Sequence, residues 1–398
     1  MRAVRLFLLV YLALIALFVA LSQLRFADKP ARTAGRPMQK GFGQSDSDLL
    51  VYSAYVDLRY AAPILRLIVI ARASNRLSLH CLIGKELVKG EFYETCENHD
   101  RPFGAFIVSC QLASPVEEET RLMLLDKNSK KSWRISVEKT VAHYSKPPPF
   151  NFTVCVHNRL YGHYYTPGYL VEFVELSKIL GAQHFIFYLS AQIRRSEDYM
   201  RVLDYYKKKN EVTLLDWDLA IEPADIWENG QGALVQDCLY RTMALSRFVL
   251  FNDLDEFFVP ARGRNWSEVV ADLWQEQPNA TGFHITPEYF LLPLSPTVSS
   301  VAFKLFQTLT LSGALFFSKL SKCLVRPERV FEMGIHHISK QAGAEYTNQQ
   351  LPSNVAKLHH YSSKYKDFAS GRQFNYDMLV FRDLCEKRVR AVLDALKL

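Results

Sequence analysis

Residues 152–190 read FTVCVHNRLYGHYYTPGYLVEFVELSKILGAQHFIFYLS and contain the pattern that decides the fold. An apolar strand, FTVCVHNRLYG, is followed by Pro167 and Gly168, which begin a helical segment that ends at Gly181. HFIFYLS is a second strand, and a further helix (SEDYMRVLDYYKKKN) and strand (VTLLDWDL) come after it. Strands that alternate with helices predict an α/β fold, with a mostly parallel sheet flanked by helices.

The next strand-like segment carries the candidate chemistry. After a helix predicted over about 232–245, residues 247–258 read RFVLFNDLDEFF, which predicts one long strand. Alternate side chains of an extended chain share a face, so we expect Asp253 and Asp255 to point the same way. Ligands bind at the carboxyl ends of parallel strands, and two carboxylates there suit Mn²⁺ or Mg²⁺ on a diphosphate. An ordinary turn with solvated acids is the alternative, and Asp216 and Asp218 could belong to the same pocket.

The N-terminus predicts a membrane anchor. Residues 6–21 are an unbroken apolar run, LFLLVYLALIALFVAL, with Arg2 and Arg5 before it. These features predict a cytoplasmic tail over 1–5, a single transmembrane span over 6–24 and a lumenal remainder. A cleaved signal peptide is the competing interpretation. Residues 25–48 are polar and rich in turn-forming residues, which is typical of a stem.

The remaining chain divides into two predicted lumenal domains. Residues 49–146 contain short segments rich in β-branched residues, which predict a small β-sandwich, and the run of prolines at 147–149 marks the boundary to a domain over 147–398. The net charge is +7, but residues 1–40 alone hold seven basic residues and one acidic residue. The body is therefore almost neutral, which argues against a nucleic-acid partner.

The cysteines and sequons agree with a lumenal location. The seven cysteines include no C-x-x-C pair, so a zinc knuckle is not expected, and one disulfide is expected among Cys81, Cys96 and Cys110. The odd number leaves at least one thiol free or intermolecular, which keeps a homodimer open. Three N-glycosylation sequons are present. Their acceptor residues are Asn151, Asn265 and Asn279.

At this point the residues resemble a known family. NDLDEFFVP (252–260) is similar to the signature of glycosyltransferase family 92, a group of Golgi β-galactosyltransferase-like enzymes. Further segments resemble the family in the same order along the chain. They are VCVHNRLYG (154–162), LVEFVELSKILGAQHFIFY (170–188), GQGALVQDCLYR (230–241), KCLVRPERVFEMGIHH (322–337) and LHHYSS (358–363). The resemblance covers about residues 150–365.

The resemblance implies a GT-A fold and a type II Golgi membrane protein that uses a nucleotide sugar, UDP-galactose first, together with Mn²⁺. It also implies that Asp253 and Asp255 hold the metal and ribose side, with Asp255 the firmer direct metal ligand. A histidine from the C-terminal part, His360, would complete the metal site, with His336 and His337 in reserve. The sequence departs from the family pattern at His157-Asn158-Arg159 and at Tyr361-Ser362.

Five more residues are candidates for contact with the nucleotide sugar. Gln231, Asp237 and Arg241 lie on the helix before the Asp253 strand, although Asp237 and Arg241, four residues apart, also fit a simple helix ion pair. Lys322 and Arg326 could supply positive charge to the diphosphate, or they could be ordinary solvated residues.

A carboxylate must also deprotonate the acceptor hydroxyl. Glu288, which follows the strand-like GFHITP (282–287), is the first candidate for this base, and Asp237 and Glu256 are its rivals. The leading hypothesis is therefore an inverting, metal-dependent hexosyltransferase that acts on a glycan or glycoprotein acceptor. An inactive, membrane-tethered glycan-binding or scaffold protein with a GT-A fold is the alternative. A hydrolase fits less well, because glycosidase acids come from separate strands about 5–10 Å apart.

Overall fold

The computed structural model describes residues 48–74, 77–114, 122–141, 147–160, 166–291, 310–311, 320–362, 373–374 and 376–398. The predicted tail, the predicted span over 6–24 and nearly all of the predicted stem lie outside these residues. Within the described ranges, no helix is both long and apolar enough to cross a membrane. All of the described residues belong to one compact unit.

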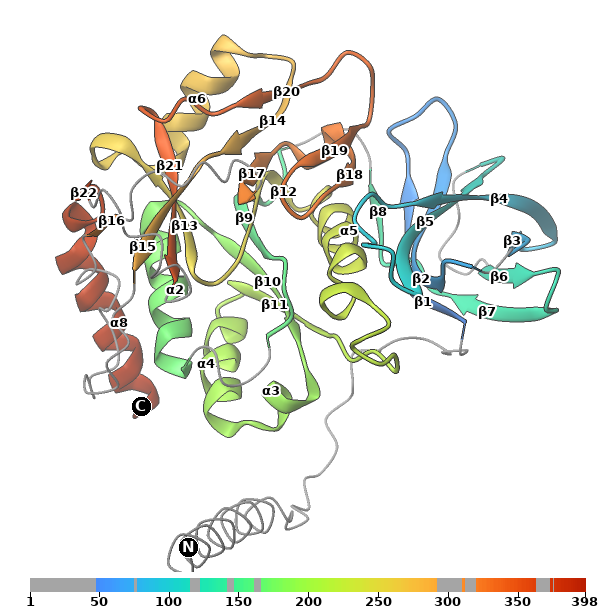
Figure 1. The fold of residues 1–398 in the computed structure, drawn as a ribbon, viewed down its shortest axis with the longest axis horizontal. Helices are drawn as coiled ribbons and strands as arrows, with labels where there is room; N and C mark the ends of the chain where they lie inside the picture. Colours follow the sequence, from blue (N-terminus) through green and yellow to red (C-terminus); the bar gives the residue numbers. More distant parts are fainter. Residues whose placement is uncertain are drawn as a thin grey trace, which may run out of the picture. The chain divides into compact units, whose positions relative to one another are not determined.

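A mostly parallel central sheet confirms the α/β prediction (Figure 1). Its strand order is β11-β10-β9-β12-β17-β14-β20, and β11, β10, β9 and β12 run parallel to one another. β17 is antiparallel to both β12 and β14, and β20 is parallel to β14. The strands are β9 (Phe150–Val156), β10 (His184–Leu189), β11 (Val212–Asp216), β12 (Ser246–Asn252), β14 (Ala280–Ile285), β17 (Lys322–Val325) and β20 (Thr347–Gln350).

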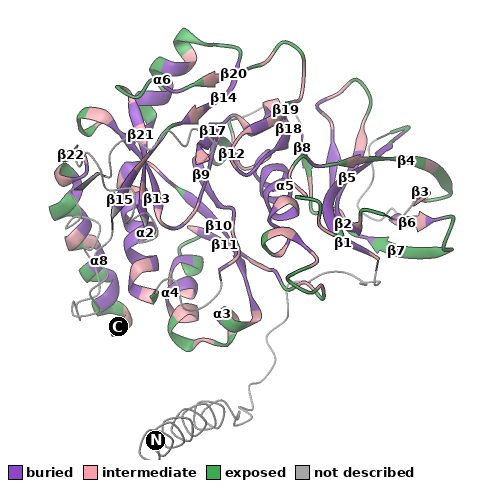
Figure 2. Ribbon diagram, viewed as in Figure 1, coloured by how far each residue is buried: buried purple, intermediate pink, exposed green. Residues whose placement is uncertain are grey.

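Helices cover both faces of the central sheet. One apolar core joins alternate residues of β9, β10 and β12 to helices α2, α4, α6 and α8, and a second core joins the other set to α5. Figure 2 shows the central strands buried and the outer faces of the helices exposed. The helices are α2 (Pro167–Leu180), α3 (Ala191–Arg195), α4 (Glu197–Lys208), α5 (Gln231–Thr242), α6 (Trp266–Glu276) and α8 (Arg382–Leu396), with 3₁₀ turns η1 (Trp227–Asn229), η2 (Ala261–Gly263), η4 (Pro327–Arg329) and η6 (Leu379–Phe381).

The segment predicted as one strand over 247–258 is two strands in different sheets. β12 ends at Asn252, residues 253–255 form a turn, and β13 (Glu256–Pro260) joins another sheet. That sheet has the order β13-β21-β15-β16-β22, with β21 (Ala356–Ser362), β15 (Pro287–Leu291), β16 (Thr310–Leu311) and β22 (Gln373–Phe374). β18 (Val330–Met333) and β19 (Ile338–Gln341) form a separate antiparallel pair.

The N-terminal strands form one continuous sheet where the sequence predicted a two-sheet sandwich. The order is β7-β6-β3-β4-β5-β2-β1-β8, and the sheet curls so that β7 comes close to β1 and the two halves enclose one apolar core. Its strands are β1 (Leu49–Asp57), β2 (Ile64–Arg72), β3 (Leu79–Ile83), β4 (Glu86–Glu94), β5 (Phe103–Gln111), β6 (Leu122–Asp126), β7 (Lys131–Ile135) and β8 (Lys139–Val141).

The outer face of this first sheet packs on helix α5, which therefore lies between the two sheets (Figure 1). In β2, Leu67 and Val69 point into the core inside the curled sheet, whereas Ile68 and Ile70 join the core around α5. Burial on both faces explains why β2 is a nearly continuous apolar run instead of an alternating one.

Two disulfides fix these layers. Cys81–Cys110 joins β3 to β5 and confirms a bridge among the three N-terminal cysteines. Cys155–Cys238 joins β9 to α5, which the sequence did not predict. Cys96, Cys323 and Cys385 are free thiols, and only Cys96 of these three is exposed.

Candidate functional site

A cavity of about 640 Å³ opens at the carboxyl ends of β9 and β12, where the sequence predicted the chemistry. The volume is within the range of small-ligand sites. Polar residues that follow the two strands meet here with residues from β17 and β21. The lining residues are Glu97, His99, Val156, Asn158, Arg159, Leu160, Leu170, Ile193, Tyr199, Trp227, Glu228, Gln231, Asp253, Leu254, Asp255, Glu256, Leu320, Lys322, Ile335, His336 and His360.

Hydrogen bonds fix the turn after β12. The Asp253 N–H donates to Oε2 of Glu256 (2.8 Å), and the Asn252 side-chain amide donates to the Glu256 carbonyl (2.7 Å). From β21, the Tyr361 N–H donates to the Asp255 carbonyl (2.8 Å). Asp253 and Asp255 therefore line the same cavity because a braced turn presents them, and not because they alternate along a strand.

Lys322 and His157 surround the carboxylate of Asp253. Lys322 Nζ lies 3.2 Å from Asp253 Oδ2 and 3.5 Å from Glu256 Oε2, and His157 Nε2 lies 3.5 Å from Asp253 Oδ2. Burial opposes ionisation of Asp253, but the charges of His157 and Lys322 outweigh it and hold its pKa well below the usual range. For Glu256, burial and the neighbouring Asp253 raise the pKa.

His360 lies beside the other two carboxylates. Its Nδ1 is 3.2 Å from Glu256 Oε1 and its Nε2 is 3.7 Å from Asp255 Oδ2. Burial lowers the pKa of His360, but hydrogen bonding to Asp255 and the charges of both acids raise it overall. Burial and the Lys322 charge lower the pKa of His336 to about 3, so that His336 is a neutral imidazole at pH 7.

These residues fit a divalent cation. His157, Asp253 and Glu256 each offer a ligand atom within 4.8 Å of the others. The Nε2 atom of His157 is buried and, among the described residues, makes no hydrogen bond beyond its 3.5 Å approach to Asp253, so this atom faces the two carboxylates. Carboxylate oxygens suit hard divalent cations, and an imidazole nitrogen is a common ligand of transition-metal ions.

The structure brings several of the predicted site residues together. Asp253, Asp255, Gln231, Lys322 and His360 all line the cavity, as does the reserve histidine His336. Gln231, on the first turn of α5, places its side-chain nitrogen 3.2 Å from Nδ1 of His157.

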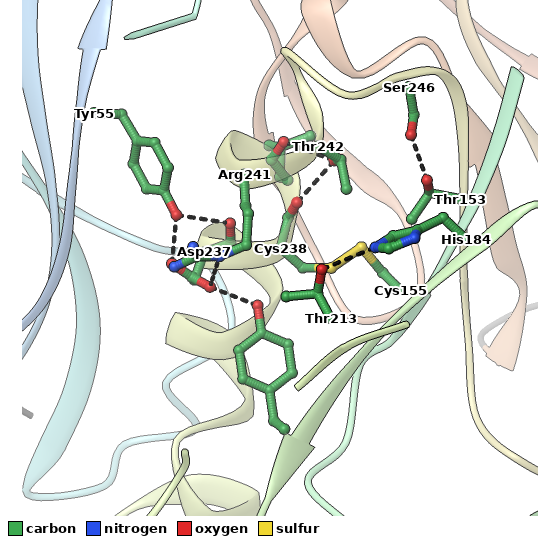
Figure 3. The surroundings of a disulfide bond; sticks show 12 residues. Tyr55, Thr153, Cys155, His184, Thr213, Asp237, Cys238, Arg241, Thr242 and Ser246 are labelled. Atoms are coloured by element: carbon green, nitrogen blue, oxygen red, sulfur yellow. Dashed lines mark hydrogen bonds and ion pairs between the residues drawn. A yellow bond between two sulfur atoms is a disulfide. The ribbon is translucent and has the colours of Figure 1, made fainter. Parts of the chain in front are cut away.

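Asp237 and Arg241 lie elsewhere, in a buried ion pair (Figure 3). The Asp237 carboxylate accepts hydrogen bonds from Tyr55 Oη (2.5 Å), Tyr188 Oη (2.6 Å) and Arg241 Nη2 (3.0 Å). Neither residue is among those that line the cavity. The structure therefore does not bring Asp237 or Arg241 to the cavity, and Asp237 joins α5 to β1 and β10 through Tyr55 and Tyr188.

Glu288 also faces away from the site. In the parallel pairing of β15 with β21, Glu288 is opposite His359 and Tyr289 is opposite His360. Side chains alternate along a strand, so Glu288 and His360 point to opposite faces, and Glu288 forms an ion pair with Lys357. The first choice of base is therefore not supported by the fold. Glu256 is the one candidate that lines the cavity, and its carboxylate is engaged with the turn.

Four other predicted residues lie outside the cavity lining that the structure describes. Arg326 pairs with Glu328 (2.7 Å), and His337 lies 3.8 Å from Glu97. Asp216 and Asp218 both pair with Arg194 of α3. The charges of Arg326, Asp216 and Asp218 are thus paired outside the cavity, whereas Glu97, the neighbour of His337, itself lines the cavity.

His157 is the residue that sequence reasoning missed. β9 and β12 pair with Val156 opposite Asn252, so the next residue of each strand, His157 and Asp253, must be neighbours. The signal was present in the sequence, since His157 directly follows the first strand, but using it required the order of strands in the sheet.

Comparison with known proteins agrees with this geometry. The sequence model of glycosyltransferase family 92 matches residues 150–394. The chain belongs to glycosyltransferase family 92. The match begins at β9, so the family 92 domain includes the central sheet and the turn of residues 253–255.

A known protein is similar to this chain over more residues than the family model matches. The chain is 27% identical over 337 residues to a protein of Caenorhabditis elegans named beta-1,4-galactosyltransferase galt-1. The aligned region covers 81% of this chain and 76% of that protein, so it reaches beyond the family 92 domain. Family membership and this relative support glycosyl transfer as the activity.

Proposed function

We propose that the protein is an inverting, metal-dependent hexosyltransferase that moves galactose from UDP-galactose to a hydroxyl group of a glycan acceptor. The observation that carries the proposal is the cluster of His157, Asp253 and Glu256 at the end of β12, inside a cavity of about 640 Å³. Hard oxygen ligands at the carboxyl end of a parallel strand are suited to a cation that binds a diphosphate.

The residues of the chain divide the work of the reaction. Asp253, Asp255, Glu256, His157 and His360 would hold Mn²⁺, which when bound neutralises charge on the diphosphate leaving group. Burial lowers the pKa of Lys322, but Asp253 and Glu256 raise it above its usual value, so its ammonium is a fixed positive charge at the leaving-group side. The Glu256 side chain holds the turn in place through the Asp253 N–H.

We also propose that the predicted span over residues 6–24 anchors the protein in the Golgi membrane, with the described residues in the lumen. Two disulfides and three exposed sequon asparagines support an oxidising compartment that carries out N-glycosylation. The asparagines are Asn151, Asn265 and Asn279.

The test uses the full-length protein, purified in detergent from a eukaryotic host. UDP release is followed with a panel of UDP-sugars, with and without Mn²⁺ and a mixed N-glycan pool. We expect Mn²⁺-dependent release that is largest with UDP-galactose and needs the acceptor. Absence of both turnover and Mn²⁺-dependent UDP binding would favour the inactive scaffold.

A further inference from the structure

Part of the cavity wall comes from outside the family 92 domain. Glu97 and His99 lie in the loop between β4 and β5 of the first sheet, and they line the cavity with Trp227 and Glu228 of η1. The proposed donor chemistry uses none of these four residues, so this part of the cavity wall is available to bind something other than the donor.

The four residues come from two loops, residues 96–100 and residues 226–230. Specific contacts fix the first loop, residues 96–100. The Cys96 N–H donates to Oε1 of Glu332 on β18 (2.7 Å), and the Ile335 N–H donates to the Glu97 carboxylate. Within the loop, the side-chain oxygen of Asn98 accepts from the Ala105 N–H (2.7 Å). These contacts hold the loop that carries Glu97 and His99 against the family 92 domain.

The second loop, residues 226–230, is fixed from both domains. Trp217 Nε1 donates to the Asn229 carbonyl (2.8 Å), and Arg159 donates to the Asn229 side chain (2.9 Å). On the other side, Ile226 forms a bridge with Phe103 at the start of β5. The loop therefore joins the cavity to the first sheet.

Aromatic rings connect the two loops. The rings of His99 and Trp227 stack with centroids 4.0 Å apart and an interplanar angle of 29°. His99 is exposed and Trp227 is half-buried, so that the pair offers ring surface at the cavity wall. Glu228 is exposed and, among the described residues, its carboxylate makes no hydrogen bond or ion pair, so it is available to a ligand.

Backbone strain is concentrated in the same two loops. Eight described residues other than glycine have a positive φ, and four of them are His99 (52°), Asp100 (54°), Glu228 (39°) and Asn229 (55°). Such conformations are energetically unfavourable and cluster at ligand sites, where the surrounding contacts hold them. Glu228 is the least suited of the four to this region, which indicates that its position has a use beyond the turn.

We propose that Glu97, His99, Trp227 and Glu228 form the subsite for the acceptor sugar, so that the first sheet is part of the transferase site. This proposal rests on the proposed function. A pyranose ring presents an apolar C–H face and several hydroxyl groups. The His99–Trp227 ring pair matches the apolar face, and the free Glu228 carboxylate accepts hydrogen bonds from hydroxyls. Glu97, already engaged with Ile335, supplies the second acidic edge.

The test measures acceptor and donor binding separately in the full-length protein. Two variants are compared with wild type: His99→Asn, because asparagine tolerates a left-handed backbone, and Glu228→Gln. Glu222→Gln is the matched control, since Glu222 is an exposed acid of the preceding segment that is not among the residues lining the cavity. A glycan array with labelled UDP-galactose and Mn²⁺ identifies the acceptor used for the measurement.

We expect the acceptor KM to rise about three- to tenfold in His99→Asn and in Glu228→Gln, the range of one lost ring contact or hydrogen bond. The Kd for UDP in the presence of Mn²⁺ should stay at the wild-type value, and Glu222→Gln should match wild type throughout. An unchanged acceptor KM in both variants would overturn the subsite while leaving the transferase standing. A wild-type protein that binds UDP with Mn²⁺ but neither modifies nor retains any glycan on the array would also overturn the subsite. Absence of UDP binding in wild type overturns the proposed function itself.

Discussion

The ammonium of Lys322 lies 3.2 Å from Oδ2 of Asp253 and 3.5 Å from Oε2 of Glu256, with only 2% of the lysine side chain exposed. Lys322 begins β17 and Asp253 follows β12, so the antiparallel pairing of these two strands creates the contact. The Lys322 ammonium partly neutralises the carboxylates of Asp253 and Glu256, which would otherwise repel each other.

Replacement of Lys322 by methionine should therefore destabilise the protein and strengthen its response to metal. The buried Glu256 carboxylate and the partly exposed Asp253 carboxylate lose their counter-charge, which costs up to about 3–5 kcal/mol. Mn²⁺ should restore part of this loss, so the rise in Tm on adding Mn²⁺ should be larger in Lys322→Met than in wild type. Lys357→Met removes the same charge from the Glu288 pair outside the cavity and should show the wild-type response. Equal Tm shifts in the two variants would contradict the metal assignment.

Asp255→Ala should abolish transfer without unfolding the protein. The backbone contact from Tyr361 to the Asp255 carbonyl remains, and the lost carboxylate is one-fifth exposed. We expect UDP release to fall more than about a hundredfold, as for other groups that stabilise developing charge. The free energy of unfolding should change by less than about 1 kcal/mol. Asp272→Ala, on the exposed face of α6, is the control and should keep full activity.

How much of this site could be predicted depends on the range of the interactions involved. The strand–helix alternation from β9 to β12 was readable because periodicity and helix ends are local. The break between β12 and β13 was not, since apolar residues flank it on both sides and the Tyr361 contact that braces it comes from a distant strand. The direction of Glu288 was not readable for a similar reason: its face is set by its register against β21.

Asp237 should make stability depend on pH in the acid range. Burial opposes its ionisation, but the charge and hydrogen bonds of Arg241 hold its pKa below the usual value of about 3.9. The unfolded chain then takes up the proton first, so this stabilisation is complete well above pH 4 and is lost as the pH falls through the folded pKa. Asp237→Asn should cost about 3–5 kcal/mol at pH 7, because Arg241 stays buried without that partner. Thermal unfolding should show that the Tm difference between wild type and Asp237→Asn becomes smaller from pH 7 to pH 3.5. A Tm difference that stays constant over this range would refute the assignment.

The two disulfides predict how many thiols can be alkylated before and after reduction. Alkylation of the denatured, unreduced protein should modify three thiols, those of Cys96, Cys323 and Cys385, and reduction should expose four more. Alanine at both Cys155 and Cys238 should lower stability by about 2–5 kcal/mol, because the bridge closes a long segment between β9 and α5. Mass spectrometry of peptides checks the pairing, and a Cys81–Cys96 bridge would contradict it.

The sequons test the orientation of the chain. Asn265 and Asn279 are exposed on either side of α6, and Asn151 is exposed at the start of β9. If the span over 6–24 leaves the described residues in the lumen, protein from a eukaryotic host should lose mass on treatment with peptide N-glycosidase. Asn265→Gln and Asn279→Gln should each remove one step of that shift, whereas Asn348→Gln, outside any sequon, should remove none. Protease added to intact microsomes should leave the described residues protected. A chain that carries no glycan and is digested in intact microsomes would place this domain on the cytoplasmic side and overturn the Golgi proposal.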